Sequence, residues 1–471
     1  MSPDLQDLRA SLGGKGLLTA PNDMAPYCAD LLGAKAAHVL AVARPANTDQ
    51  VCETLIWCRR NGIGVVPQGG LTGLVNGAVP AGQAPEVILS LGRMNKIGPV
   101  DTLDNTMIVE AGAVLATVKQ AAEAADRYFP LTHGGEGSSQ IGGNLATNAG
   151  GNNALRYGTA RDQVLGLEVV LPDGTVWSDL RCLRKNTAGY DLKQLFIGAE
   201  GTLGIITKAC LKVRPFPRAR ETAFTAIPGP GAALAFYRDL EQHVGETIAA
   251  FELLSPNAVR RGLTIEGARC PFDRTDSWLA LVELETAAER FDLKGALEDA
   301  IGQGLEDEHI VDAVIAQSIQ HRSEFWRLRE AIAEAFVDEI DSLKSDTAVP
   351  VGQVPAFIIA AGAAVEAAVP GAECNPFGHL GDGNIHFNVR RPDHMAPAQF
   401  RERWGVVSEA IEKAALGLGG TISAEHGIGR LKKRGFAASA SAADQALLRA
   451  LKKSIDPQMM MNEGAILDLD G

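Results

Sequence analysis

Three of the nine histidines lie in two short, glycine-flanked stretches that are well suited to holding a metal ion. The stretches are Gly378-His-Leu-Gly-Asp-Gly-Asn-Ile-His386 and Ser423-Ala-Glu-His-Gly427. Asp-Gly between β-like residues is a strong signal for a two-residue hairpin turn. Counting outward from that turn pairs His379 with His386 on one side of the hairpin, with Cβ atoms about 5 Å apart. Such a pair could chelate a metal at metal–nitrogen distances of about 2.0–2.1 Å.

Glu425 and His426 are adjacent, so in an extended segment their side chains point in different directions. One of them could therefore ligate the metal while the other faces a different target. The same alternation places Asn384 and Asn388 on the face of His386, which makes Asn388 a candidate donor to a substrate. Two histidines and one carboxylate suit zinc, manganese or iron equally well, and Zn²⁺ is our first expectation.

Three glycine-rich segments could cradle a dinucleotide: Pro67-Gln-Gly-Gly-Leu-Thr-Gly73, Gly134 to Gly151, and Gly198-Ala-Glu-Gly-Thr-Leu-Gly204. Glycine lets backbone N–H groups approach phosphate oxygens closely, and the interleaved Ser, Thr and Asn add further donors. One such segment alone would be interpreted as a tight turn. Three of them next to strands favour a cofactor site. The sequence has neither a complete GxGxxG fingerprint nor a P-loop, which disfavours a nicotinamide or nucleotide-triphosphate site of those types.

The bulk properties describe a globular protein of more than one domain. The chain has 471 residues, of which 46% are hydrophobic and 21% charged. A net charge of -13 argues against a nucleic acid or an anionic membrane as partner. The apolar run 357–372 contains Glu366 and is shorter than the ~20 residues of a membrane span. We therefore expect a soluble, cytoplasmic protein with reduced cysteines.

The elements expected to position these residues are of mixed type. Strands are predicted at 87–91, 106–110 and 164–171, and a helix capped by Asn47 is predicted to run to Asn61. The composition changes after the proline-rich and glycine-rich stretch 215–231, which marks a domain boundary. We expect an α+β protein with three parts: 1–215, a substrate domain at 216–420 that carries the hairpin, and a helical C-terminal segment at 421–471.

The glycine segments resemble those of FAD-binding proteins of the vanillyl-alcohol oxidase and p-cresol methylhydroxylase fold. The matching stretches are 65–80, 141–174 and 186–207. The resemblance implies a two-part FAD-binding domain and an antiparallel-sheet cap domain. Because residues 65–80 contain no His or Cys for covalent attachment, we expect FAD to be held non-covalently. The residues that the resemblance assigns to FAD are Pro67, Gln68, Gly69, Gly70, Leu71, Thr72, Gly73, Gly137, Ser138, Gly142, Gly143, Asn148, Gly150, Gly151, Gly158, Glu200, Gly201, Gly204, Ile205 and Asn462.

Three later stretches, 375–389, 421–432 and 455–467, are similar to the branch of that fold that contains D-2-hydroxyglutarate and D-lactate dehydrogenases. The resemblance implies that His379, His386 and Glu425 bind the metal and that His426 is the catalytic base. It also implies that Arg329 and Lys344 bind a substrate carboxylate. The usual Asn-Pro-Gly reads Asn462-Glu-Gly464 here, and Ala333 stands where a Thr is common.

The implied reaction is oxidation of a D-2-hydroxy acid, with hydride transfer to flavin and proton transfer to His426. D-2-Hydroxyglutarate is the first expectation, D-lactate and D-malate stay open, and a flavin oxidase of a bulky alcohol is a more distant alternative. The expected electron acceptor is an electron-transferring flavoprotein or a quinone. We also expect a homodimer.

Overall fold

The computed structural model describes residues 4–36, 38–82, 84–273, 275–337 and 341–468, and the chain divides into two compact units. Unit 1 comprises Met1–Gly151, Gly158–Phe216 and Glu425–Gly471. Unit 2 comprises Asn152–Tyr157 and Pro217–Ala424. The chain therefore enters unit 2 briefly at Asn152–Tyr157 and again after Phe216, and it returns to unit 1 after Ala424.

The first sheet of unit 1 has the strand order β1-β2-β4-β3, with β2, β4 and β3 parallel and β1 antiparallel. Helix α3 (Thr48–Asn61) connects β2 to β3, and its first turn is capped by Asn47, whose side chain accepts a hydrogen bond from the N–H of Gln50. Met461 bridges to β3 in parallel, so the C-terminal segment extends this sheet. The strands are β1 (Leu17–Leu18), β2 (Val39–Ala43), β3 (Gly64–Gln68) and β4 (Glu86–Ser90).

The second sheet of unit 1 is antiparallel, in the order β5-β9-β7-β8. The predicted strands at 87–91, 106–110 and 164–171 correspond to β4, β5 and β7. Both sheets contribute to a single apolar core. The strands are β5 (Thr106–Glu110), β7 (Val164–Val170), β8 (Val176–Asp179) and β9 (Ile205–Lys212), and β6 (Arg127–Tyr128) pairs with β10 (Arg214–Pro215). The other helices are α1 (Gln6–Leu12), α2 (Pro21–Met24), α4 (Leu115–Ala124), α5 (Ile141–Ala146), α13 (Lys433–Ser439) and α14 (Ala442–Ile455).

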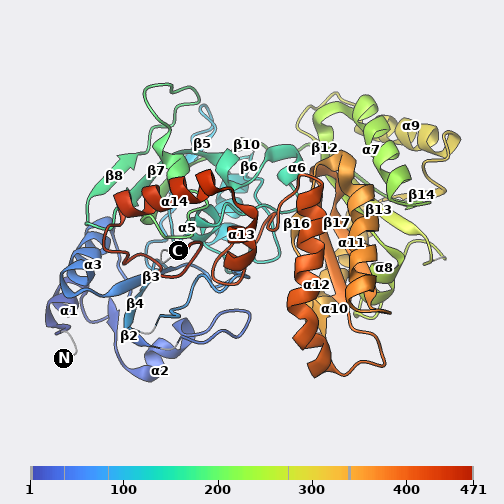
Figure 1. Cartoon of the computed structure of the whole chain (residues 1–471). Coiled ribbons are helices and arrows are strands. Elements are labelled where there is room, and N and C mark those ends of the chain that lie inside the picture. Colours follow the sequence, from blue (N-terminus) through green and yellow to red (C-terminus); the bar gives the residue numbers. More distant parts are fainter. Residues whose placement is uncertain (1–3, 37, 83, 274, 338–340, 469–471) are drawn as a thin grey trace. The chain divides into compact units, whose positions relative to one another are not determined.

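Unit 2, in which Figure 1 labels strands β12, β13, β14, β16 and β17, is built on an antiparallel sheet. The strand order is β14-β11-β13-β12-β17-β18-β15, with β16 also paired to β18. The strand order β14-β11-β13-β12 is that of a ferredoxin-like β-α-β-β-α-β unit, with one additional helix between β12 and β13. The strands are β11 (Ala219–Ile227), β12 (Ile248–Leu254), β13 (Trp278–Thr286), β14 (Asp312–Ile315), β15 (Ser342–Leu343), β16 (Thr347–Ala348), β17 (Glu373–His379) and β18 (Asn384–Arg390).

Helices cover both faces of the unit 2 sheet. One face packs against α7 (Pro230–Val244), α9 (Leu293–Glu306), α11 (Val354–Ala368) and α12 (Pro397–Gly417). The other face packs against α8 (Pro256–Gly262) and α10 (Ile319–Val337). Neighbouring residues of β11, Ala223 and Phe224, lie in the two different cores, as the alternation of a strand requires. The short helix α6 (Ala154–Tyr157) also belongs to this unit.

Within the described residues, Val351–Ala368 is long and apolar enough to cross a membrane by length and composition alone. The segment consists of a 3₁₀ turn (Val351–Gln353) followed by α11. The side chains of Phe357, Ala361 and Val365 are fully buried in the core of unit 2. A helix that packs on a sheet meets the same criterion.

Candidate functional site

The predicted histidine hairpin exists in unit 2, but its register differs from the prediction. Strands β17 and β18 are joined by a four-residue loop, 380–383, that contains a 3₁₀ turn and ends at Gly383 in the left-handed region (φ 84°). His379 is therefore paired with Asn384, and His386 with Phe377. The predicted direct pairing of His379 with His386 is wrong because Gly383 ends a longer loop and is not the second residue of a two-residue turn.

The two histidines nevertheless share one face of the hairpin. They are diagonal neighbours on adjacent strands, since a shift of two residues preserves the side of the sheet. Their ring centroids are 5.7 Å apart, and the ring planes are close to perpendicular (75°). His379 is 5% exposed and His386 is half-buried. The tertiary structure thus brings two imidazoles together on adjacent interior strands of the unit 2 sheet.

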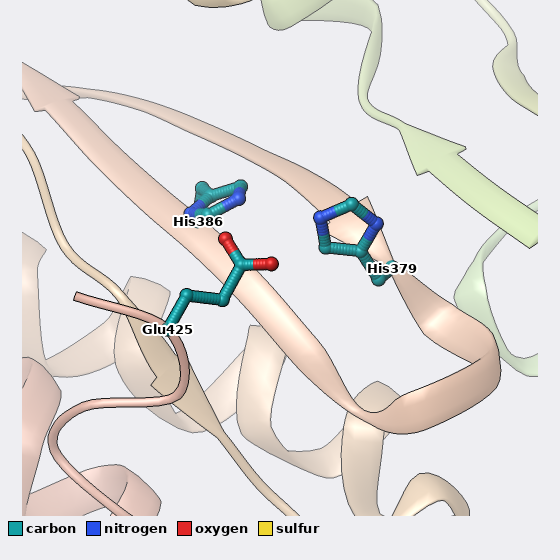
Figure 2. Close-up of side chains that lie close together, drawn as sticks. All are labelled: His379, His386 and Glu425. Carbon is teal, nitrogen blue, oxygen red and sulfur yellow. The ribbon is translucent and has the colours of Figure 1, made fainter. Parts of the chain in front are cut away.

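Glu425 completes the predicted ligand set. It directly follows Ala424, the last residue of unit 2, and the segment before it is attached to that unit's sheet. Thr421 and Ala348 bond to each other through their backbones, and the N–H of Ala424 donates to the carbonyl of Asp346 (3.3 Å). The possible ligand atoms of His379, His386 and Glu425 all lie within 4.8 Å of one another (Figure 2). Two imidazoles and a carboxylate form a donor set that fits zinc, manganese or iron.

A buried carboxylate, Glu252 of β12, lies behind this histidine pair. Its side chain is fully buried; one oxygen is 2.5 Å from Nδ1 of His379, and the other accepts from Nε of Arg329, also at 2.5 Å. Burial alone raises the pKa of the Glu252 carboxyl, but the charges and hydrogen bonds of Arg329 and His379 outweigh it. The pKa therefore lies well below its ordinary range, and Glu252 is an anion in the interior.

Arg329, a predicted substrate cation, is 7% exposed on α10. A lone arginine on a helix is ordinarily a solvated charge, but this one is paired with Glu252. Its guanidinium carbon also lies 5.1 Å from the ring centroid of Phe377. Arg329 is thus a buried residue of unit 2 and is packed against the residues that support the hairpin.

The remaining predicted substrate residues lie around β18. Asn388 is 4% exposed, and its Oδ1 accepts from the backbone N–H of Ser345 (3.3 Å), which places the segment after β15 beside β18. Lys344 precedes Ser345 and has an exposed side chain. Asp346, which the sequence reasoning did not single out, is buried and accepts from Asn384 and Ser423. A second group of possible ligand atoms within 4.8 Å joins Asp346 to Glu425 and to His426, the predicted base.

In unit 1, the three glycine-rich segments pack against one another. A Cβ added to Gly70 would lie 2.0 Å from the carbonyl oxygen of Ser138, so the first segment contacts the backbone of the second. A Cβ added to Gly201, which has φ 72°, would lie 2.8 Å from Pro67, so the third segment contacts the first. A side chain at Gly70 would overlap the backbone of Ser138, and a side chain at Gly201 would overlap the ring of Pro67 and strain a left-handed backbone.

Four of the residues assigned to FAD by resemblance have a left-handed backbone although they are not glycines. They are Leu71 (φ 58°), Asn148 (φ 50°), Glu200 (φ 48°) and Asn462 (φ 46°). Such conformations are costly for residues with a Cβ and gather at functional sites that over-determine them. Their concentration in these loops is consistent with a site in which backbone groups are aimed at a ligand.

Two of these residues also tie segments of unit 1 together. The carboxylate of Glu200 accepts hydrogen bonds from the backbone N–H groups of residues 428–429, both at 2.8 Å. The Asn462 amide donates to the carbonyls of Gly77 and Glu200 and accepts from Arg430. These ties hold the segment that follows His426 against the glycine loops.

The loops offer hydrogen-bond acceptors as well as closely packed backbone to a ligand such as FAD. The amide oxygens of Gln68 and Gln140 are buried, and neither has a hydrogen-bond partner within the described protein. A buried unsatisfied acceptor is costly, and the hydroxyl and ring N–H groups of FAD are donors that would satisfy it, whereas the pyrophosphate only accepts. The residues of 67–73, 134–151 and 198–204 are therefore those that would hold the dinucleotide.

Sequence reasoning missed three residues of these sites. Glu252 is the charged residue in the otherwise apolar strand Ile248–Leu254. A charge in a buried strand indicates a paired or functional residue, so Glu252 could have been found from the sequence. Asp346 gave no signal in the sequence beyond its polarity. His133 stands just before the second glycine segment, where its Nδ1 accepts from the N–H of Gly135 (3.1 Å) and its Nε2 lies 3.2 Å from Oδ1 of Asn144.

Two family models match successive parts of the chain. The chain matches the model for the C-terminal domain of FAD-linked oxidases over residues 216–466 and that for an FAD-binding domain over residues 39–179. It is 34% identical over 468 residues to a D-2-hydroxyglutarate dehydrogenase of Xanthomonas citri pv. viticola, covering 99% of this chain and 97% of that relative. The mitochondrial D-2-hydroxyglutarate dehydrogenase of Arabidopsis thaliana is 36% identical over 427 residues, covering 90% and 74%.

A solved structure of p-cresol methylhydroxylase superposes on 99% of this chain and 97% of its own, with a TM-score of 0.78 at 16% sequence identity. At that identity the likeness concerns the fold alone. It confirms the predicted fold, with an FAD-binding part and an antiparallel-sheet part.

Proposed function

Because this chain belongs to the FAD-linked oxidases and, within them, to the D-2-hydroxyglutarate dehydrogenase family, we propose that it oxidises D-2-hydroxyglutarate to 2-oxoglutarate. The observation that carries the proposal is the cluster of His379, His386 and Glu425. A hydroxy acid offers a hydroxyl and a carboxylate on neighbouring carbons, which suits a metal ion held by three protein ligands with open positions.

An α-hydroxy acid can release its C2 hydrogen as hydride only if the hydroxyl proton also leaves. When bound, non-covalent FAD would supply the hydride acceptor, and a divalent ion held by His379, His386 and Glu425, Zn²⁺ first, would supply the charge that lowers the hydroxyl pKa. The imidazole of His426 accepts the hydroxyl proton, because imidazole is the side chain best suited to take up a proton near neutral pH. Asn388 donates from its amide to the reacting carboxylate. The products are a 2-oxo acid and reduced flavin.

The test of this reaction is optical. Purified protein should be yellow, and acid should release its flavin, because no attachment side chain lies in 65–80. Adding D-2-hydroxyglutarate without oxygen should bleach the visible flavin band within one turnover, while the L-isomer should leave it in place. An unbleached flavin in protein loaded with both FAD and Zn²⁺ would contradict the proposed reaction. NAD should not replace an electron-transferring flavoprotein or a quinone as acceptor.

Preference for a diacid depends on the cations of unit 2. Arg329 is buried and paired with Glu252, and the side chain of Lys344 is exposed and within reach of a ligand from solvent. We assign the second carboxylate of D-2-hydroxyglutarate to Lys344. D-Malate and D-lactate are the competing substrates, since Ala333, which replaces a common Thr, cannot donate a hydrogen bond from its side chain.

Lys344→Ala should therefore lower kcat/KM for D-2-hydroxyglutarate about ten- to hundredfold. A charge-assisted hydrogen bond is worth about 1.5–3 kcal/mol, and 1.36 kcal/mol corresponds to a factor of ten. D-Lactate oxidation should change much less. The control is Lys413→Ala, which removes an exposed lysine of α12 in the same unit. Equal losses on both substrates would mean that Lys344 grips the reacting carboxylate or supports the fold.

A further inference from the structure

Glu252 is a charged residue whose burial needs an explanation. It lies on β12 directly opposite His379 of β17 in the antiparallel register, and its side chain has no exposed surface. An unpaired carboxylate in such a place would cost several kcal/mol, so an anion is kept there only with partners that satisfy it. Its two oxygens have different partners, His379 and Arg329. Glu252 therefore joins a predicted metal ligand to a predicted substrate cation.

The contact with His379 defines which ring nitrogen is available to a metal. Nδ1 of His379 lies 2.5 Å from the Glu252 carboxylate, so Nδ1 carries the proton of that hydrogen bond. A neutral imidazole then has its acceptor lone pair on Nε2. A histidine that ligates a metal commonly donates its other N–H to a carboxylate, which fixes the tautomer and the ring orientation.

The contact with Arg329 extends the arrangement to the second histidine. The Arg329 guanidinium lies over the ring of Phe377, with 5.1 Å from its carbon to the ring centroid. The ring of Phe377 is in turn 5.2 Å from the ring of His386. His379 is thus braced by the carboxylate that Arg329 binds, and His386 by the aromatic ring that Arg329 covers. All these residues belong to unit 2.

We propose that Glu252 is a positioning residue for the metal: it holds His379 in the tautomer and orientation that bind the ion, and Arg329 holds Glu252 in place. The inference rests on the proposed function for the identity of the metal ligands and adds a residue 127 positions away from His379 in sequence. Removal of such a supporting carboxylate typically weakens metal binding about 10- to 100-fold. Glu252 lies outside the groups of possible ligand atoms among the described residues, so it acts through His379.

The test compares two buried glutamates of one sheet. Glu252→Gln removes the charge behind His379, and Glu283→Gln is the matched control. Glu283 lies on the neighbouring strand β13, is 5% exposed, and binds an arginine of α10, Arg322, at 2.7 and 2.9 Å. It also accepts from Trp326 and Thr222, and none of these three partners is a histidine. Both variants leave an α10 arginine without its anion, and only one loosens a metal ligand.

Zn²⁺ affinity of the FAD-loaded protein is measured by competition with a chromogenic chelator, with no substrate present. Glu252→Gln should bind Zn²⁺ about 10- to 100-fold more weakly at unchanged FAD content, and Glu283→Gln should bind it like the parent. Unchanged Zn²⁺ affinity in Glu252→Gln would overturn the proposal. So would equal weakening in both variants, because the effect would then be a general loss of packing.

A double-variant cycle separates positioning from folding. In a His379→Ala background, Glu252→Gln should weaken Zn²⁺ binding no further, because the ring that it positions is gone. Full additivity would contradict the proposal. If Glu252→Gln does not fold, Glu252→Asp keeps the charge but shortens the side chain, and should show weaker Zn²⁺ binding and an altered visible spectrum with Co²⁺ as probe. Parent-like Co²⁺ spectra and Zn²⁺ affinity in Glu252→Asp would overturn it.

Failure of the inference is distinguishable from failure of the proposed function. The metal measurements use no hydroxy acid, so they give the same ranking of variants whichever substrate the protein oxidises. The proposed function fails instead if the flavin of the metal-loaded parent is not reduced by any D-2-hydroxy acid.

Discussion

The glycine loops of unit 1 and the histidine hairpin of unit 2 would bind their proposed cofactors in opposite ways. In unit 1 the proposed binding groups belong to the backbone, and close contacts such as that of Gly70 with Ser138 shape the loops. In unit 2 the proposed ligands are side chains, and His379 is in turn contacted by Glu252, a side chain from another strand. Backbone sites are therefore encoded locally, whereas side-chain sites are encoded by the pairing of distant segments.

The comparison predicts that the two sites fail independently. A variant of the hairpin should lose metal and keep FAD, and a variant of the glycine loops should lose FAD and keep metal. Each outcome can be measured by metal analysis and flavin content on the same sample.

The largest effect is expected for His386→Ala. Removing one of three protein ligands should release the metal and lower turnover on the order of a thousandfold, since a metal supplies several kcal/mol of stabilisation and 1.36 kcal/mol is a factor of ten. The FAD spectrum should stay in place, as it should after treatment with EDTA. Full metal content with parent-like activity in this variant would remove His386 from the ligand set.

His426→Ala is the companion to that variant, because the two histidines are assigned different tasks. Loss of a general base costs about 10²–10⁴-fold in rate. This variant should therefore lose turnover while its metal content, measured by elemental analysis, remains that of the parent. Metal loss in His426→Ala would instead indicate that His426 belongs to the ligand group with Asp346 and Glu425.

A smaller effect is expected in unit 1 for Gly70→Ala. The added Cβ would overlap the Ser138 carbonyl, and forcing atoms into a packed region costs about 1–3 kcal/mol. Release of FAD should become roughly tenfold to hundredfold easier, by fluorescence of the freed flavin, while Zn²⁺ content is unchanged. The control is Gly14→Ala, where a Cβ meets no atom within 4 Å. Equal FAD retention in both variants would break the assignment of the first loop.

The smallest effect concerns pH. Burial lowers the pKa of the His133 imidazole, so the folded protein resists protonation of this ring. The unfolded chain binds the proton with a pKa of about 6.5, so this histidine's contribution to stability is complete above about pH 6.5 and declines as the pH falls below it. The temperature of FAD release should therefore fall below that pH, and His133→Gln should reduce the slope.

The matching control for the pH experiment is His243→Gln, which removes an exposed histidine of α7 in unit 2. Its slope should follow that of the parent. If His133→Gln also follows the parent, other groups set the acid sensitivity of unit 1.

The features of this protein that depend on neighbouring residues could be predicted from its sequence. Asn47 caps α3 as predicted, because a cap needs only its own side chain and the next few N–H groups. The predicted strand 106–110 has the bounds that the structure shows. The glycine segments could be recognised because a close backbone contact needs glycine at that position. Two histidines on one face of a hairpin also followed from sequence, since the period of a strand is two residues.

The register of the histidine hairpin and the burial of Arg329 depend on contacts between segments that are distant in sequence. The loop between β17 and β18 takes four residues and not two, so His379 pairs with Asn384, a choice that Asp382-Gly383 alone could not make. Arg329 became a buried ion pair because β12 presents Glu252 to α10 from 77 residues away. A local pattern determines which side of a strand a residue takes, but only the packing of distant strands and helices determines which charge it meets there.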